Sequence, residues 1–229
     1  MRVIAILVLT LVAVSAAYCA DIVTVPTANQ LKAGQVDVAY YYLGLDSEAP
    51  APTKVGAHTL YVGITDRIEL DLHRYDPNRD KTSTIVNATV LLLPETALNP
   101  AVVIGGRNLG GTETSDYAPN TDKKSWFISA AKNVTPMLPS GPKLPLVRLH
   151  VSLGTKDLTL LGESRHSGLF GGVQALLTPE IGAVVLHDGR DLITGLTFTP
   201  ANKGVTLKGG MFGDHWWVGI SYAKTITAL

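Results

Sequence analysis

The stretch RIELDLHRY, residues 67–75, decides the fold of this chain. Its apolar residues alternate with charged and polar ones. Because successive side chains of a β-strand point to opposite faces, the stretch predicts a strand with one apolar face. That face carries Ile68, Leu70 and Leu72. The other face carries Arg67, Glu69, Asp71, His73 and Tyr75.

The same alternation recurs along the chain. In VRLHVSL, residues 147–153, Arg148 and His150 oppose an apolar row, and WWVGISY, residues 216–222, closes the chain in the same way. Helical periodicity is scarce, so the pattern predicts an all-β protein. The predicted strands cover residues 36–45, 57–65, 67–76, 82–93, 99–109, 125–135, 145–155, 168–178, 181–188, 191–200, 204–212 and 215–226.

The links between these strands alternate in length. Long polar links such as DPNRDKT and GTETSDYAPNTDKK alternate with short ones such as TD at 65–66 and TPE at 178–180. VTPMLPSGPKLP at 134–145 is long for a turn, and the last two outer links, DGRD and GD, are short. Long outer loops and short periplasmic turns are typical of up-and-down outer-membrane barrels. We therefore predict an antiparallel up-and-down transmembrane β-barrel of about 12 strands, within a range of about 10–12.

The N-terminal residues predict three regions. Residues 1–20 combine Arg2 with an apolar run and small residues, which indicates a secretory signal peptide. A membrane anchor is the weaker interpretation, because the run is shorter than a spanning helix requires. Residues 21–35 form an N-terminal segment with turns at Pro26 and Gly34, and 36–229 form a single barrel domain. We expect residues 21–34 to cap the periplasmic mouth.

Composition and motifs exclude several functions. The formal net charge is zero, with 19 basic and 19 acidic residues, so there is no electrostatic case for nucleic acid. The six histidines show no metal-ligand spacing, and no nucleophile motif is present. The sequence predicts no catalytic residues, no metal, no cofactor and no enzymatic activity.

Three groups of residues are candidates for function. The candidates for lining the lumen, either as a wet channel or as mutually paired ions, are Arg67, Glu69, Asp71, His73, Arg148 and His150. The stretch Asp188, Gly189, Arg190 and Asp191 is interpreted as a hairpin turn, and the alternative is a sugar-binding or docking loop. The candidates for an interfacial aromatic girdle are Tyr40, Tyr42, Trp126, Trp216 and Tyr222. Their alternative is core packing in a soluble β-sandwich.

Two stretches resemble the YjbH-like outer-membrane β-barrel family, which is associated with exopolysaccharide production and secretion. They are VPTANQLKAGQVDVAYYY, residues 25–42, and LFGGVQALLTPEIGAVVLHDGRDLITGLTFTP, residues 169–200. YVGITDRIELDL, residues 61–72, matches a hairpin that is widespread in outer-membrane barrels. Larger family members are several times longer, and this chain ends in Ala-Leu instead of the terminal aromatic residue common in such barrels.

The resemblance implies a cell-envelope protein of a Gram-negative-type bacterium, in the outer membrane after signal-peptide cleavage. Its expected partners are outer-membrane lipid, the barrel-assembly machinery, and polysaccharide or its export proteins. The expected function is a structural or narrow-pore protein linked to exopolysaccharide. The alternative is a secreted soluble β-sandwich or small barrel that binds carbohydrate or a small ligand. It buries the same apolar faces against each other, so periodicity alone does not decide between the two.

Overall fold

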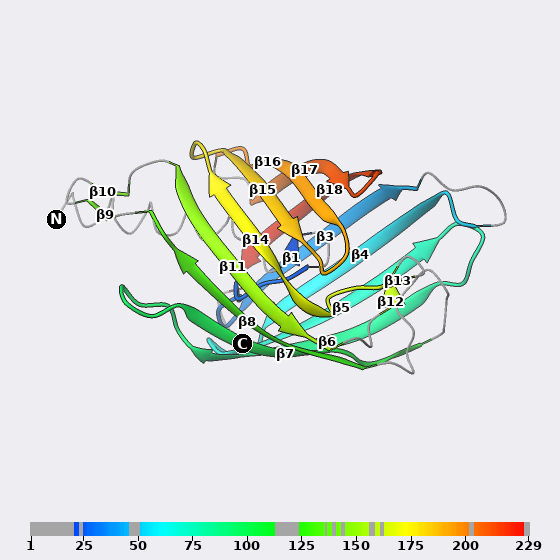
Figure 1. Ribbon diagram of the computed structural model, residues 1–229, viewed down its shortest axis with the longest axis horizontal. Helices are drawn as coiled ribbons and strands as arrows, with labels where there is room; N and C mark the ends of the chain where they lie inside the picture. Colours follow the sequence, from blue (N-terminus) through cyan, green and yellow to red (C-terminus); the bar gives the residue numbers. More distant parts are fainter. Residues whose placement is uncertain are drawn as a thin grey trace.

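The computed structural model describes residues 21–22, 25–45, 51–112, 124–135, 137–138, 141–142, 145–155, 159–160, 163–201 and 204–226. Within these residues the main feature is one closed antiparallel β-barrel of 12 strands (Figure 1). No helix among them is long and apolar enough to cross a membrane. The predicted signal peptide, residues 1–20, lies outside the described part of the chain.

Each strand of the barrel pairs with its neighbours in the chain, and the last strand pairs with the first. The barrel strands are β3 (Gln35–Gly44), β4 (Lys54–Gly63), β5 (Ile68–Pro77), β6 (Ser83–Leu93), β7 (Ala101–Thr112), β8 (Ser125–Asn133), β11 (Leu146–Gly154), β14 (Gly168–Leu176), β15 (Ile181–His187), β16 (Leu192–Phe198), β17 (Val205–Phe212) and β18 (His215–Thr225). Three two-residue pairs do not belong to the barrel wall: β1 (Asp21–Ile22) with β2 (Val25–Pro26), β9 (Met137–Leu138) with β10 (Gly141–Pro142), and β12 (Thr159–Leu160) with β13 (Glu163–Ser164).

The predicted up-and-down barrel is confirmed, and each predicted strand corresponds to one strand of the wall. The largest shifts are three residues: β4 begins at Lys54 instead of residue 57, and β7 ends at Thr112 instead of residue 109. At the start of β4, the Asn78 side-chain oxygen accepts the backbone N–H groups of Thr53 and Lys54, which holds this strand beside the end of β5. The β-sandwich interpretation is wrong, because one sheet closes on itself and two sheets do not pack face to face.

Closure of the barrel depends on the pairing of β18 with β3, which extends from Trp216 opposite Gly44 to Thr225 opposite Gln35. A closed sheet leaves no strand edge with unpaired N–H and C=O groups, which a bilayer core could not satisfy. We call the end with the links after β3, β5, β7 and β11 the long-loop end, at the right in Figure 1. The opposite end, where β18 ends and the β9–β10 pair projects, is the short-turn end.

The two faces of the wall differ as the alternation predicts. On β5, Leu70 and Leu72 are each 42% exposed on the outside, whereas Glu69 is 2% exposed and His73 is fully buried on the inside. Large apolar side chains such as Val151 and Leu196 also face outward. A water-soluble protein buries such residues and exposes its charges. The barrel instead exposes large apolar side chains over its outer face and buries charged ones beside apolar ones inside, which suits a lipid environment around the wall.

A β-bulge between β6 and β7 changes what the lumen contains. The register shifts between Val86 and Ala88, and Asn108 adopts a positive φ of 57°. The bulge places two successive side chains, Arg107 and Asn108, on the inner side, at 3% and 0% exposure. A regular strand would have turned one of them outward.

Candidate functional site: the closed lumen

The N-terminal segment, residues 25–34, occupies the short-turn half of the lumen. Val25, Thr27 and Ala28 are at most 3% exposed, and Asn29 and Leu31 are also buried. Figure 1 shows β1, immediately before this segment in the chain, within the outline of the barrel. The segment therefore runs inside the barrel before the chain enters the wall at β3. This placement goes further than the predicted cap on the mouth.

The segment leaves the lumen through a turn at the short-turn rim. Gln35 N–H donates to the Lys32 carbonyl at 2.9 Å, and Gly34 has a φ of 75°, which favours glycine. Gly34 N–H donates to Gly63 O, and its own carbonyl accepts from Ile226 N–H. The turn predicted at Gly34 thus ties the segment to the beginning and the end of the wall.

Polar groups of the wall hold the backbone and side chains of the segment. The Glu69 carboxylate accepts the backbone N–H of Leu31 at 2.6 Å. Gln30 Nε2 donates to the carbonyl oxygens of Arg67 and Thr89 at 2.9 and 3.3 Å. The Glu69 contact satisfies a buried backbone N–H of the segment, and the Gln30 contacts tie its side chain to the backbone just before β5 and within β6.

Arg148 and its neighbours form a second anchor, on β11 and β14, away from β5 in the wall. Arg148 Nε donates to Asn29 Oδ1 at 2.8 Å, and its Nη1 pairs with the Glu95 carboxylate in the link after β6. Asn29 Nδ2 donates to Gln174 Oε1 at 3.2 Å, and this oxygen lies 2.7 Å from His150 Nε2. One buried cation thus binds both the segment and a turn at the short-turn rim.

Apolar side chains gather in the long-loop half of the lumen, beside polar ones such as Arg107 and Asn108. The apolar side chains form one buried cluster with Val25 and Ala28 of the N-terminal segment. The members nearest the long-loop end are Leu43, Val55, Tyr75, Ile85, Phe127, Phe170, Leu186, Ile193, Phe212 and Trp217. Val25 and Ala28 are members of this cluster, so the segment has apolar packing in addition to its hydrogen bonds.

The chain before β14 closes the long-loop end. Arg165, 3% exposed, pairs with the carboxylates of Asp188 and Asp191, each at 2.7 Å, and its guanidinium lies 4.7 Å from the centre of the Phe212 ring. His166 N–H donates to the Asp188 carbonyl at 2.7 Å. The Arg165–Asp188 ion pair is buried from water. Because a buried charge without its partner is strongly destabilising, closure of this end depends on the two side chains remaining paired.

Asp188, Gly189, Arg190 and Asp191 form the hairpin turn between β15 and β16. Asp188 Oδ1 accepts the backbone N–H groups of Arg190 and Asp191 at 2.9 and 2.7 Å, and Gly189 has a φ of 94°. Asp188 Oδ2 binds Arg165, whereas Arg190 is exposed and pairs with Glu163 at 3.0 Å. The turn therefore also holds the segment that covers the lumen.

His166, which lies in the loop outside the wall strands, is held neutral. Its Nδ1 lies 3.1 Å from Arg107 Nη1, and a guanidinium only donates, so Nδ1 accepts and the proton lies on Nε2. Burial, followed by the positive charges of Arg107 and Arg165, holds the pKa of His166 well below its ordinary value of 6.5.

Acidification is therefore expected to destabilise the long-loop end. The unfolded chain takes up a proton on His166 near its ordinary pKa of 6.5, whereas the folded chain does not until a lower pH. The stability that neutral His166 contributes is fully present above the unfolded-state pKa of 6.5, and it is lost progressively as the pH falls from there towards the folded-state pKa. The unfolding free energy should fall less between about pH 7 and about pH 5 in His166→Asn than in the unchanged protein. Asparagine is chosen because it tolerates the φ of 56° at this position. Equal pH dependence in the two proteins would contradict the role of His166.

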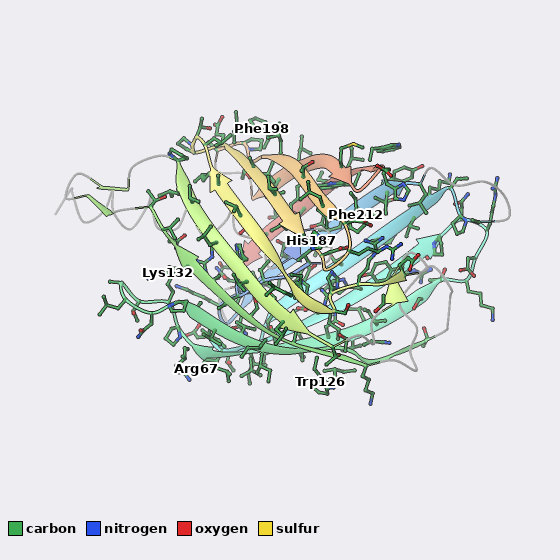
Figure 2. The ribbon with its side chains drawn as sticks, viewed as in Figure 1. Arg67, Trp126, Lys132, His187, Phe198 and Phe212 are labelled. Carbon is green, nitrogen blue, oxygen red and sulfur yellow. The ribbon has the colours of Figure 1, made fainter. Side chains whose placement is uncertain are left out.

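The structure brings most of the predicted lumen residues together. Glu69, Asp71, His73, Arg148 and His150 are all buried on the inner face. Arg67 is the exception, because it precedes β5 and is exposed at the short-turn rim (Figure 2). Because Arg67 precedes the strand, its side chain does not follow the alternation of β5. Its backbone carbonyl oxygen still accepts the Gln30 side chain of the N-terminal segment.

The predicted girdle residues all lie on the outer face. Tyr42, Trp126 and Trp216 are near the long-loop end, and the Tyr42 and Trp216 rings are 5.2 Å apart. Tyr222 lies towards the short-turn end, and Tyr40 lies between. Figure 2 shows Trp126 and Phe198 on the outside of the barrel. Phe198, 42% exposed at the short-turn end of β16, was missed although its alternation with Leu196 could have indicated it.

Several inner residues were not predicted as candidates. Asp37 and Lys208 are buried on β3 and β17, where Lys208 Nζ donates to the Tyr41 hydroxyl at 3.1 Å. The alternation along β3 already placed Asp37 on the face opposite the apolar row, so the sequence could have indicated it. Arg107 and Arg165 had no such signal, since one depends on a bulge and the other on a link between strands.

Comparison with known proteins identifies the fold alone. No protein-family model matches the sequence, and no curated protein matches it. Among solved structures, the chain is similar to the KdgM porin, with a TM-score of 0.51 and 12% identity over 82% of this chain and 98% of that one. A second match is the N-terminal β-barrel domain of Pseudomonas aeruginosa OprF, with a TM-score of 0.27 and 8% identity over 85% of this chain and all of that one.

Proposed function

We propose that this protein is a bacterial outer-membrane β-barrel whose lumen is closed by its own chain, and that it acts as a structural or narrow-pore component of the cell envelope. The observation that carries the proposal is the N-terminal segment inside the lumen, with an apolar layer and the Arg165 contact beyond it. An open diffusion channel would leave this path to water.

The outward apolar face supports the membrane location. Exposed side chains such as Leu149, Val151 and Leu153 continue along one strand, at 41%, 57% and 57% exposure. Surfaces of this kind on soluble proteins are confined to small patches, and here they alternate with buried polar residues on strand after strand. This distribution counts against the secreted soluble carbohydrate-binding interpretation. The signal peptide, the outer-membrane lipid and the barrel-assembly machinery belong to the same proposal.

A link to exopolysaccharide production or export is the finer part of the proposal. It rests on the resemblance of residues 25–42 and 169–200 to the YjbH-like family. These residues include the N-terminal segment and the Asp188 turn, which are the two parts that close the lumen. In this proposal the protein has no enzymatic activity, and polysaccharide or its export proteins are its partners.

The membrane location is tested by cell fractionation and heat modifiability. The protein is expressed with its own signal, the outer membrane is isolated, and electrophoresis is run with and without boiling. A band in that fraction that shifts on boiling is expected, because a closed barrel resists detergent until it is heated. A soluble band without a shift would overturn the proposal.

Conductance in planar bilayers tests the closed lumen. We expect rare, small openings from the unchanged protein and steady conductance after deletion of residues 21–31, because the deletion removes the segment and leaves the turn at Gly34 in place. Glu69→Gln is the milder variant, since it weakens the bond to Leu31 N–H, for which a charged acceptor contributes about 1.5–3 kcal/mol. It should open more often than Glu180→Gln, which changes an exposed carboxylate in a turn.

A reversible cross-link separates displacement of the segment from general loosening. Asn29→Cys and Gln174→Cys, combined with Cys19→Ser, place thiols at two side chains that are 3.2 Å apart in the unchanged protein. Bridging them with a short, reducible bifunctional thiol reagent should abolish the openings, and reduction should restore them. Openings that persist in the bridged protein, or unchanged conductance after the deletion, would show that the segment does not close the pore.

A further inference from the structure

Two basic side chains interrupt the apolar outer face on β4 and β5. His58 and Arg74 lie opposite each other in the register, and their side chains are 56% and 57% exposed. On β5, Arg74 follows the outward Leu70 and Leu72. A charge on the lipid face of a barrel is destabilising in proportion to its depth, so its position requires a compensating group.

The patch lies beside the aromatic girdle at the long-loop end. On β4, Lys54 is exposed one outward position beyond Gly56, and it pairs in register with Gly44 of β3. The Trp216 ring covers Gly44, because a Cβ built there would meet its side chain. Aromatic girdles mark the level of the lipid headgroups. Lys54 is therefore at that level, and Arg74 is slightly deeper.

The hydrogen bonds of Arg74 leave part of its guanidinium available. Its Nε donates to both oxygens of Asp76 at 3.2 Å, and no bond of its two terminal nitrogens is found in the described part of the chain. Asp76 is already engaged, because it also lies 3.5 Å from His58 Nε2 and accepts the Thr82 hydroxyl at 2.8 Å. Within the group formed by Lys54, Arg74 and Asp76, one carboxylate therefore stands against two cations, so the balance of charge is positive.

Tyr40 completes the patch on the neighbouring strand. Its ring centre is 4.8 Å from that of His58, and its hydroxyl lies over Gly56, 3.2 Å from where a Cβ would stand. The absence of a side chain at Gly56 leaves the hydroxyl beside the basic groups. Guanidinium, ammonium, imidazole and phenol donors here converge from three adjacent strands.

We propose that Lys54, His58, Arg74 and Tyr40 bind the phosphate of a phosphate-bearing lipid in the leaflet at the long-loop end. The inference rests on the proposed membrane location. The terminal nitrogens of a guanidinium match two phosphate oxygens, and an ammonium adds a point charge at the headgroup level. A lipid phosphate already lies at the headgroup level and supplies the negative charge that the outward cations require. Free phosphate would first have to lose its hydration to reach the same place.

The experiment compares refolded barrels in vesicles of phosphatidylcholine with and without lipid A, using the temperature at which half of the heat-modifiable band is lost. Lipid A should raise this temperature for the unchanged protein, and Arg74→Gln with Lys54→Gln should lose most of the shift. The matched control is Arg190→Gln, an exposed cation at the same end that also pairs with a carboxylate. It should keep the full shift.

Each other outcome overturns the inference in a distinguishable way. A band that does not shift on boiling contradicts the membrane barrel itself. A heat-modifiable barrel that is equally stable in both vesicles, or an equal loss in Arg190→Gln, overturns the lipid site and leaves the barrel in place. An equal rise produced by inorganic phosphate in vesicles without lipid A would assign the patch to free phosphate.

Discussion

Asp188→Ala is expected to lower the free energy of unfolding by about 3–5 kcal/mol, as the loss of one partner of a buried ion pair does. Asp188 is fully buried and binds Arg165 through one oxygen and two backbone N–H groups of its turn through the other. Its removal leaves a buried guanidinium with one carboxylate fewer and a hairpin turn without its acceptor. The long-loop end should become open to water and to protease.

Asp191→Ala is the control for this variant. Asp191 also pairs with Arg165 at 2.7 Å, but its side chain is 31% exposed and Arg165 keeps Asp188. Asp191→Ala should therefore lower the free energy of unfolding much less than Asp188→Ala does. Unfolding by urea in lipid vesicles, followed by tryptophan fluorescence, measures both. Equal effects of the two substitutions would show that burial of Asp188 does not determine the strength of this contact.

Leu70→Arg is expected to destabilise the barrel by about 2–4 kcal/mol if the position is near the middle of the bilayer, and to block assembly in cells. Leu70 is 42% exposed on the outer face, between Val62 and Ala88 of the adjacent strands. In the membrane, an arginine there replaces lipid contact with a buried charge. If water surrounded the outer face, an arginine there would stay hydrated and would not destabilise the protein. The loss of stability therefore reports directly on contact with lipid.

Asp71→Asn, one residue along the same strand, provides the contrast. Asp71 is 5% exposed and faces the lumen, where asparagine keeps the volume and a hydrogen-bonding side chain. We expect it to be tolerated. The fraction of heat-modifiable protein in the outer membrane measures both variants. Equal tolerance of Leu70→Arg and Asp71→Asn would contradict the assignment of the faces.

The wall of the barrel could be predicted because its signal is local. The alternation of Ile68, Leu70 and Leu72 with Glu69 and Asp71 follows from the opposite directions of successive side chains in a strand, whatever the strand pairs with. Lengths of links and the positions of turns then indicate an up-and-down order. This information lies within a few residues of each strand, so it is readable without the fold.

The contents of the lumen could not be predicted in the same way. Residues 25–34 carry turn signals and polar residues, which suit a cap on the mouth as well as a segment inside the barrel. Their placement depends on bonds such as Leu31 to Glu69 and Asn29 to Gln174, whose partners lie on strands far along the chain. The contact of Asn29 with Gln174 requires the sheet to curve until β14 faces the segment.

The sequence by itself therefore determined the strands, their two faces and the order of the wall, since these depend on backbone geometry and the spacing of apolar residues. The tertiary structure decided that Arg67 lies outside the lumen, that a bulge brings Arg107 into it, and that Arg165 closes one end. The physical reason is that closure of the sheet sets which residues face each other across the interior. Contacts between side chains across the interior do not recur at a regular spacing along the chain, so the sequence pattern does not reveal them.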